Sequence, residues 1–227
     1  MSEWERRNGV LSCCLSDRGH VRRRNEDAVL ALPDAGLWAV ADGMGGHADG
    51  DVASRVVVET LAVCAGRHRG RVLVERVPEA LQAANRELIR YGAGRVVGST
   101  VAVLVLEDEN YHCFWAGDSR IYLWRDRGLR QLTEDHVAGP GTAWPDALTR
   151  AVGVEPDLEP AYRTGYLYER DVLLLCTDGL TKVVDDVTIA GLLDSTAPQH
   201  ACRRLVDAAL VRGGPDNVSC VTVAVGW

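Results

Sequence analysis

No segment of the sequence approaches the roughly 18 consecutive apolar residues that a membrane-spanning helix needs. The first residues, MSEWERRNGVLSCC, include acidic side chains and lack the apolar run of a secretory signal peptide. These absences argue against a membrane protein and against a secreted protein. We therefore expect a cytoplasmic location.

The sequence also lacks an excess of basic residues. Lys and Arg number 25 against 32 Asp and Glu, so the formal net charge is -7 and the isoelectric point is near 5.4. A nucleic-acid surface or a polybasic membrane surface would require concentrated positive charge. We expect no nucleic acid and no membrane as partner, and we expect a monomer. The surplus of carboxylates is compatible with cation binding.

Neither a disulfide framework nor a zinc-ligand spacing is present among the seven cysteines. Their number is odd, and most of them lie inside apolar stretches, which is typical of buried free thiols. Internal repeats, low-complexity tracts and a Pro/Gly/Ser-rich linker are also missing. We therefore expect one domain over residues 1–227.

Apolar spacing predicts the main elements. DAVLALPDAGLWAVADG contains two short strands, near 28–32 and 37–41, joined by the turn PDAG, so that Asp27 would face Asp42 at the open end of a hairpin. Helical spacing predicts helices over 53–64, over 77–92 with a start at Pro78, and over 197–214. The basic residues 66–76 are interpreted as a solvated loop, with partner docking as the alternative.

Later segments are rich in Val, Leu and aromatic residues and are interrupted by Gly and Asp, which is typical of antiparallel strands. These segments are residues 99–107, 111–133, 171–180 and 217–225. The helices therefore occur in two groups separated by strands. This order favours a layered α+β sandwich over an alternating parallel-sheet fold.

Five aspartates stand at strand ends or in a turn between strands: Asp27, Asp42, Asp118, Asp178 and Asp216. Any one of them is explained by turn formation, because Asp beside Gly or Asn bonds its own backbone. Together they could converge at one rim of a sandwich. Carboxylates about 4 Å apart would then repel by roughly 4 kcal/mol per pair. Such a rim would require a bound cation or raised pKa values.

Carboxylates, a backbone carbonyl and water suit magnesium or manganese rather than zinc. The Gly43 carbonyl could approach a metal without obstruction by a side chain. Two such ions would hold a water molecule and clamp a phosphate, which is the arrangement that hydrolyses phosphate esters. Arg22, Arg23 and Arg24 offer a counter-charge for the phosphate, although a solvated basic run explains them equally simply.

Several segments, in order, resemble the type 2C metal-dependent protein serine/threonine phosphatases, particularly the compact bacterial ones. The resemblance runs from about residue 15 to the end of the chain. It rests on SDRGHVRRRNEDAV, AVADGMGGHADGDVAS, GSTVAVLVL, WAGDSRIYLW, LTEDH, LTRAVG, LLCTDGL and GGPDNVSCVTV.

The resemblance implies a four-layer α/β/β/α sandwich of two central antiparallel sheets, with a dinuclear Mn2+ or Mg2+ site at one end. By position, Asp42 matches the ligand shared by both metals and Gly43 the carbonyl ligand. Three further matches complete the first metal and the phosphate site: Asp178 and Asp216 as carboxylate ligands and Arg22 as the phosphate-binding arginine.

The remaining matches lie around these ligands. Glu26 and Asp27 match the acidic pair that holds the second metal through water, and Asn217 is the asparagine beside the last ligand. Asp118 matches an aspartate of a third, weaker metal site in bacterial members.

The sequence departs from the family at the proton donor. A histidine stands two positions after the bridging aspartate in the animal enzymes, whereas this chain has Met44 there. Met44 cannot donate a proton, so the donor is either water or His47. His47 is equally explained as a cap of the following helix.

The second departure is the flap, which is helical in bacterial relatives. Only residues 137–147, VAGPGTAWPDA, are available for it, and this Gly/Pro-rich segment is too short for two helices. We expect a loop, a more open active site with Trp144 as a surface contact, and a third metal site weakened by the missing flap.

The leading hypothesis is metal-dependent hydrolysis of phosphoserine and phosphothreonine on proteins by a metal-activated water, reversing a bacterial serine/threonine kinase as a cognate partner. The alternative is a pseudophosphatase that uses the fold to bind a partner, which the short flap favours. The retained Asp42, Asp178 and Asp216 argue against this alternative.

Overall fold

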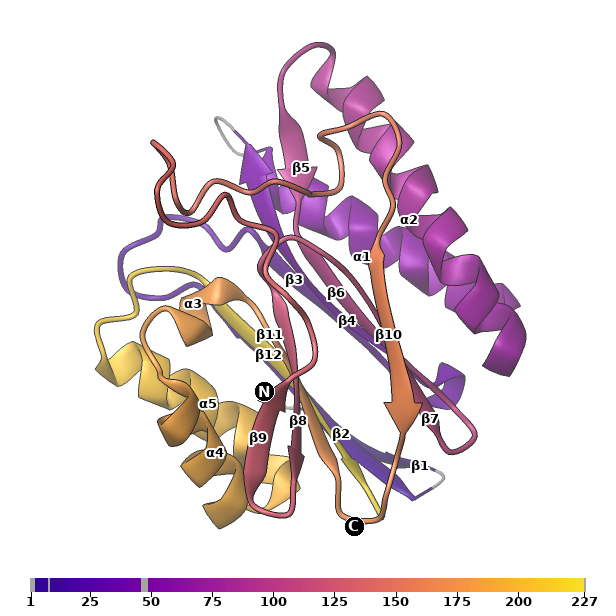
Figure 1. Ribbon diagram of the computed structural model, residues 1–227, viewed down its shortest axis with the longest axis vertical. Coiled ribbons are helices and arrows are strands. Elements are labelled where there is room, and N and C mark those ends of the chain that lie inside the picture. The colour runs from indigo at the N-terminus through magenta and orange to yellow at the C-terminus, as the bar shows by residue number, and fades with distance from the viewer. Residues whose placement is uncertain (1–2, 8, 46–48, 227) are drawn as a thin grey trace.

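The computed structural model describes residues 3–7, 9–45 and 49–226 of the chain. In this part of the chain, the strands form two antiparallel sheets, and helices cover both outer faces of the pair (Figure 1). The layers follow the order helix, sheet, sheet, helix. The α/β/β/α sandwich expected from the sequence is confirmed.

One sheet has the strand order β1-β2-β12-β11-β8-β9. Its central strands are apolar on both faces because they lie between helices and the other sheet. The strands are β1 Glu3–Arg7, β2 Val10–Asp17, β8 Arg120–Arg125, β9 Gly128–Gln131, β11 Val172–Cys176 and β12 Val218–Val225.

The other sheet has the order β10-β7-β6-β4-β3, and a short strand, β5, also pairs with β4. A 3-10 turn, Pro33–Ala35, joins β3 to β4, and Gly36 ends it with a φ of 67°. The strands are β3 Asp27–Leu32, β4 Leu37–Gly45, β5 Val97–Ser99, β6 Val101–Glu107, β7 Asn110–Ala116 and β10 Ala161–Tyr166.

Two long helices, α1 (Gly50–Arg67) and α2 (Gly70–Gly92), cover the sheet that contains β4. The opposite face of the sandwich carries α4 (Asp186–Ser195) and α5 (Pro198–Val211), beside the single turn α3 (Asp178–Thr181). Figure 1 shows these groups on opposite sides of the sheets. Within the described residues, no helix is both long and apolar enough to cross a membrane.

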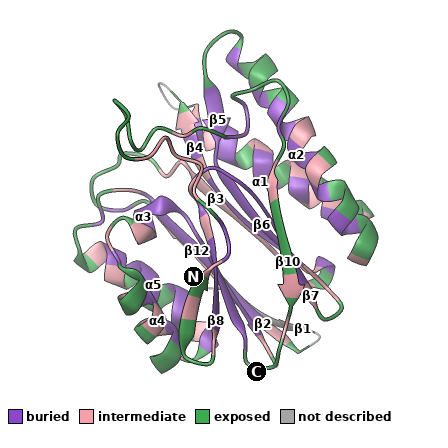
Figure 2. Cartoon of the chain, viewed as in Figure 1, coloured by how far each residue is buried: buried purple, intermediate pink, exposed green. Residues whose placement is uncertain are grey.

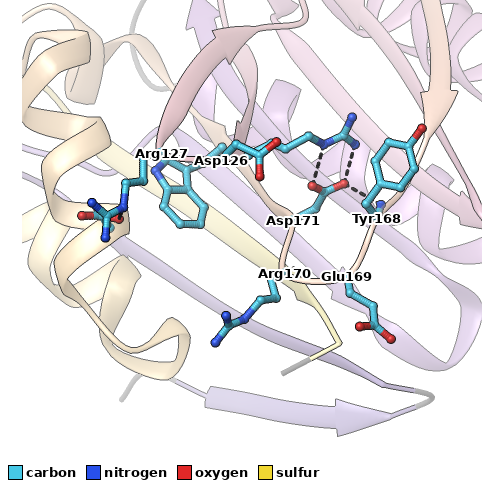
Figure 3. A pocket seen from close by; sticks show the side chains of 9 residues that line it. Asp126, Arg127, Tyr168, Glu169, Arg170 and Asp171 are labelled. Atoms are coloured by element: carbon cyan, nitrogen blue, oxygen red, sulfur yellow. Dashed lines mark hydrogen bonds and ion pairs between the residues drawn. The ribbon is translucent and has the colours of Figure 1, made fainter.

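Three apolar layers hold the sandwich together, and Figure 2 shows the buried strands between them. Leu61 and Leu81 pack against the sheet of β4, Trp38 and Leu173 lie between the sheets, and Leu205 packs against the sheet of β12. Each fully buried side chain of this size contributes about 1.5 to 3 kcal/mol. The packing fixes the strand ends, where the aspartates lie.

The predicted start of the second helix is wrong. α2 begins at Gly70, Pro78 lies inside it, and most of the basic stretch 66–76 is helical rather than a loop. Leu73, Val74 and Val77 continue the buried stripe of the helix toward its N-terminus. Their burial, at about 1.5 to 3 kcal/mol each, exceeds the roughly 3 kcal/mol that an interior proline costs.

Candidate metal centre

Asp27 and Asp42 are direct partners across the β3–β4 hairpin, as the symmetric turn predicted. The hairpin opens at this pair, at the end of the sandwich that also carries α3 (Figure 1). Thr100, at the start of β6, fixes the backbone here, since its Oγ1 accepts a hydrogen bond of 3.1 Å from the Asp42 N–H. Two carboxylates therefore lie side by side where the hairpin leaves the core.

Asp27 connects the two sheets. Its Oδ2 accepts hydrogen bonds from the hydroxyls of Thr177, at 2.8 Å, and Ser219, at 2.7 Å. Thr177 directly precedes Asp178, and Ser219 lies on β12, so both donors belong to the opposite sheet. The other oxygen of Asp27, Oδ1, is buried and has no hydrogen-bond partner among the described residues.

Asp178 is buried, at 9% exposure, and is the first residue of α3. Its Oδ2 accepts a hydrogen bond from the ammonium group of Lys182, four residues later. Its Oδ1 is buried and has no hydrogen-bond partner within the described part of the chain. Asp27 and Asp178 thus share a pattern: one oxygen is held by the protein, and the other is buried and unsatisfied.

Asp216 precedes β12 and forms an ion pair of 2.8 Å with Nη2 of Arg22. Beside it, Asn217 is buried and connects three segments of the N-terminal loop. Its Oδ1 accepts from the Glu26 N–H, and its Nδ2 donates to the carbonyls of Arg18 and Arg24, each at 2.8 Å. Asn217 therefore positions the loop that carries Arg22, Glu26 and Asp27.

Gly43 lies where backbone segments meet. Its N–H donates to the Glu26 carbonyl at 3.0 Å, and a Cβ on Gly43 would lie 1.9 Å from the Gly50 carbonyl oxygen. A Cβ on Gly50 would lie 2.7 Å from Oε1 of Glu26 and 2.9 Å from the carbonyl oxygen of Gly43. Both oxygens therefore lie against the first residue of α1, which requires glycine at positions 43 and 50.

Asp118 lies in the turn between β7 and β8 and is half-buried. Burial raises its pKa to about 6, the charge of Asp178 adds to the increase, and Lys182 opposes it. Burial raises the pKa of Asp27 to about 7 despite its hydrogen bonds from Ser219 and Thr177. Burial, followed by the charges of Asp27, Asp178 and Asp118, raises the pKa of Asp42 well above its usual range. These aspartates act on one another, so the structure brings them to one rim.

The donor chemistry of this rim fits divalent cations. The available groups are carboxylates and a backbone carbonyl, two buried carboxylate oxygens lack partners, and raised pKa values mark unbalanced negative charge. Among the described residues, no group of three or more Asp, Glu, His or Cys side chains is arranged so that it could hold a metal ion. Arg22 and Lys182 instead bind Asp216 and Asp178.

The segment that contains the candidate proton donor is described only in part. Met44 lies on β4, and its methyl group lies beside Gly98 of β5. His47 lies outside the described residues. The choice between water and His47 therefore stays a prediction.

Residues 137–147 contain turns and no helix, all of them being described, and a β-bridge joins Val137 to Leu148. Trp144 is 78% exposed. These residues therefore form no helical lid.

Sequence reasoning missed Lys182, Thr177 and Ser219. The two hydroxyls hold Asp27 only because β3 of one sheet meets β11 and β12 of the other, which no local pattern reveals. Lys182 had a local signal: it follows Asp178 by four residues, a spacing that brings side chains together when the backbone is helical.

Comparison with known proteins agrees with this arrangement. The family described as "Protein phosphatase 2C" matches residues 18–212. The curated serine/threonine protein phosphatase PstP of Mycobacterium tuberculosis is 34% identical over 92% of this chain, which spans only 44% of the length of PstP.

Solved structures extend the comparison to the fold. PppA, described as a key regulatory component of T6SS in Pseudomonas aeruginosa, superposes with a TM-score of 0.89 at 37% identity, over 95% of this chain and 97% of PppA. The PstP catalytic domain in complex with two manganese ions gives 0.86 at 35% identity, over 95% and 98% of the two chains. The chain therefore belongs to the protein phosphatase 2C family.

Proposed function

We propose that this chain is a metal-dependent protein phosphatase that removes phosphate from phosphoserine and phosphothreonine, with two Mn2+ or Mg2+ ions as cofactors. Family membership supports the reaction, and the two manganese ions in the PstP catalytic domain support the cofactor. The observation that carries the proposal is the rim of Asp27, Asp42, Asp118, Asp178 and Asp216, with two buried carboxylate oxygens that have no hydrogen-bond partner among the described residues.

The residues divide between two ions. Asp42 would be shared, and Asp178 and Asp216 would be the remaining carboxylate ligands of the first ion. The Gly43 carbonyl would be a further ligand, and Glu26 and Asp27 would hold the second ion through water. When bound, the ions supply charge neutralisation and activation of a water molecule for attack on phosphorus. The protein holds these groups through Thr177 and Ser219 on Asp27, and through Asn217 on the loop before Asp27.

Arg22 would bind the phosphate. It reaches the rim through a single nitrogen, Nη2, on Asp216, and its side chain is half-exposed. Its other N–H groups make no hydrogen bond to the described residues, so they are available for phosphate oxygens. A planar guanidinium can donate two parallel hydrogen bonds to a phosphate, which fits this role.

The test is release of phosphate from a phosphothreonine peptide. We expect activity that depends on Mn2+, loss of at least about a hundredfold in Asp42→Asn, and little change in the surface control Asp207→Asn. Arg22→Ala should mainly raise KM, because it removes a contact with phosphate. Wild-type protein that stays inactive with excess Mn2+ on peptides and on simple aryl phosphates would contradict the proposal.

Other parts of the hypothesis extend this proposal. The chain would act as one catalytic domain, with residues 137–147 as a loop in place of a flap, on phosphorylated proteins and against a cognate serine/threonine kinase. A cytoplasmic location and a monomeric state stay predictions from the sequence. Phosphoproteomics of a strain that lacks the gene would identify the substrates.

A further inference from the structure

Lys182 is the only lysine in the 227-residue sequence, which otherwise uses 24 arginines. This single ammonium group lies at the acidic rim, where it donates a hydrogen bond to Oδ2 of Asp178. Every other side chain with a permanent positive charge is an arginine. A lysine at this one position calls for a physical reason.

The backbone holds Lys182 in place. The Lys182 N–H donates to the Asp178 carbonyl at 2.8 Å, which closes the turn of α3. Gly179 packs so closely on the segment just before β12 that a Cβ there would lie 1.8 Å from the Asn217 carbonyl oxygen. The turn is therefore fixed against the neighbouring segment, and the four-residue spacing keeps the ammonium beside the carboxylate.

Several carboxylates act on this ammonium. Burial alone would lower the pKa of Lys182, but the hydrogen bond with Asp178 and the charges of Asp178, Asp118 and Asp216 outweigh it and raise the pKa. The same ammonium opposes the increase in the pKa of Asp118. Lys182 therefore offsets negative charge of Asp178, which it contacts, and of Asp118, whose pKa it lowers.

The hydrogen bond also gives the two carboxylate oxygens of Asp178 different surroundings. Lys182 binds Oδ2, and Oδ1 remains buried without a partner in the described chain. Asp27 shows the same division, with Thr177 and Ser219 on Oδ2 and a partnerless Oδ1. A group that fixes one oxygen of a ligand orients the other toward the ion.

We propose that the Lys182 ammonium is a built-in cation of the centre, which orients Asp178 and balances the charge of Asp118, so that the centre binds two divalent ions and excludes a third. This inference uses the proposed function only in taking the rim as the metal centre. A compact ammonium replaces a metal ion better than a planar guanidinium, which explains the lysine.

Calorimetric titration of the metal-free protein with Mn2+ tests the proposal. We expect two equivalents in the wild type, two in Lys182→Arg, which keeps the charge, and a third, weaker equivalent in Lys182→Met, which frees Asp118 and Oδ2 of Asp178. Three equivalents in the wild type, or two in Lys182→Met, would overturn it. Circular dichroism verifies that each variant is folded.

If Lys182→Met does not fold, Asp118→Asn gives an independent measurement. Because the proposal leaves Asp118 without a metal, this variant should keep two equivalents of Mn2+. Loss of one equivalent would show that Asp118 holds an ion, and would overturn the proposal.

The single lysine allows a direct observation. Protein labelled with 15N only in lysine should show one side-chain ammonium signal, protected from exchange by the bond to Asp178, both before and after saturation with Mg2+. A signal lost to rapid exchange on adding Mg2+ would mean that the ion displaces Lys182, contrary to the proposal. Wild-type protein that binds two Mn2+ but does not cleave phosphopeptides would instead refute only the proposed function.

Discussion

At the scale of single residues, the glycines that follow two of the rim aspartates both allow a close contact with a backbone carbonyl. Gly43 follows Asp42 and approaches the Gly50 carbonyl, and Gly179 follows Asp178 and approaches the Asn217 carbonyl. Neither close approach allows a Cβ. The Asp-Gly pairs therefore place a carboxylate beside a tight backbone contact, and the contact fixes where the carboxylate lies.

Gly179→Ala tests this requirement. Because the new Cβ would lie 1.8 Å from a backbone oxygen, the backbone of α3 must shift, and we expect the free energy of unfolding to fall by about 3 kcal/mol. The control is Gly191→Ala in α4, where a Cβ meets no atom within 4 Å and should stabilise by about 0.5 to 1 kcal/mol. Urea denaturation measures both variants. Equal effects would show that the contact at Gly179 relaxes freely.

At the scale of elements, local patterns predicted what depends on local contacts. The turn of the β3–β4 hairpin sets its register, so the pairing of Asp27 with Asp42 could be read from the sequence. The amphipathic pattern predicted α1 and α5 for the same reason. The ties of Asp27 to Thr177 and Ser219 could not be predicted, since they depend on how two sheets stack. The sequence predicts α2 too short, because proline is typical of a helix start, whereas buried Leu73 and Val77 extend the helix back to Gly70.

Pro78→Ala follows from the position of Pro78 inside α2. Alanine restores an N–H that can donate to the Val74 carbonyl and removes the crowding by the proline ring. We expect the free energy of unfolding to rise by about 1 to 2 kcal/mol, less than the full helix-interior cost of proline because Pro78 is partly buried. Thermal unfolding measures the effect. The control is Glu87→Ala at an exposed position of the same helix, which should change the free energy of unfolding by less than about 0.5 kcal/mol. A loss of stability would mean that the packing of the ring outweighs the missing hydrogen bond.

At the scale of the whole molecule, charge repulsion at one end of the sandwich destabilises the fold that the apolar layers stabilise. The apolar layers bring the sheets together, and this brings Asp27, Asp42, Asp118 and Asp178 within reach of one another's charge. Folding therefore creates repulsion at the rim, relieved in part by Lys182 and Arg22. Divalent ions would relieve the remainder, so metal binding and stability should be linked.

The pH dependence of unfolding tests that link. The pKa of Asp27 is about 7 in the folded chain against a usual value of 3.8, so its contribution to stability is present below pH 4 and is lost as the pH rises through 7. Burial lowers the pKa of His112 and His136, so these two groups act in the opposite direction: stability rises as the unfolded chain loses its histidine protons above pH 6.5. Between pH 6.5 and 8 we therefore expect the protein in EDTA to lose about 1 kcal/mol, or roughly 3 °C in Tm, relative to the same protein with saturating Mn2+. With saturating Mn2+, Tm should instead hold or rise, because the ions bind the ionised carboxylates. Parallel curves with EDTA and Mn2+ would contradict the link, and Asp42→Asn should flatten the fall seen with EDTA.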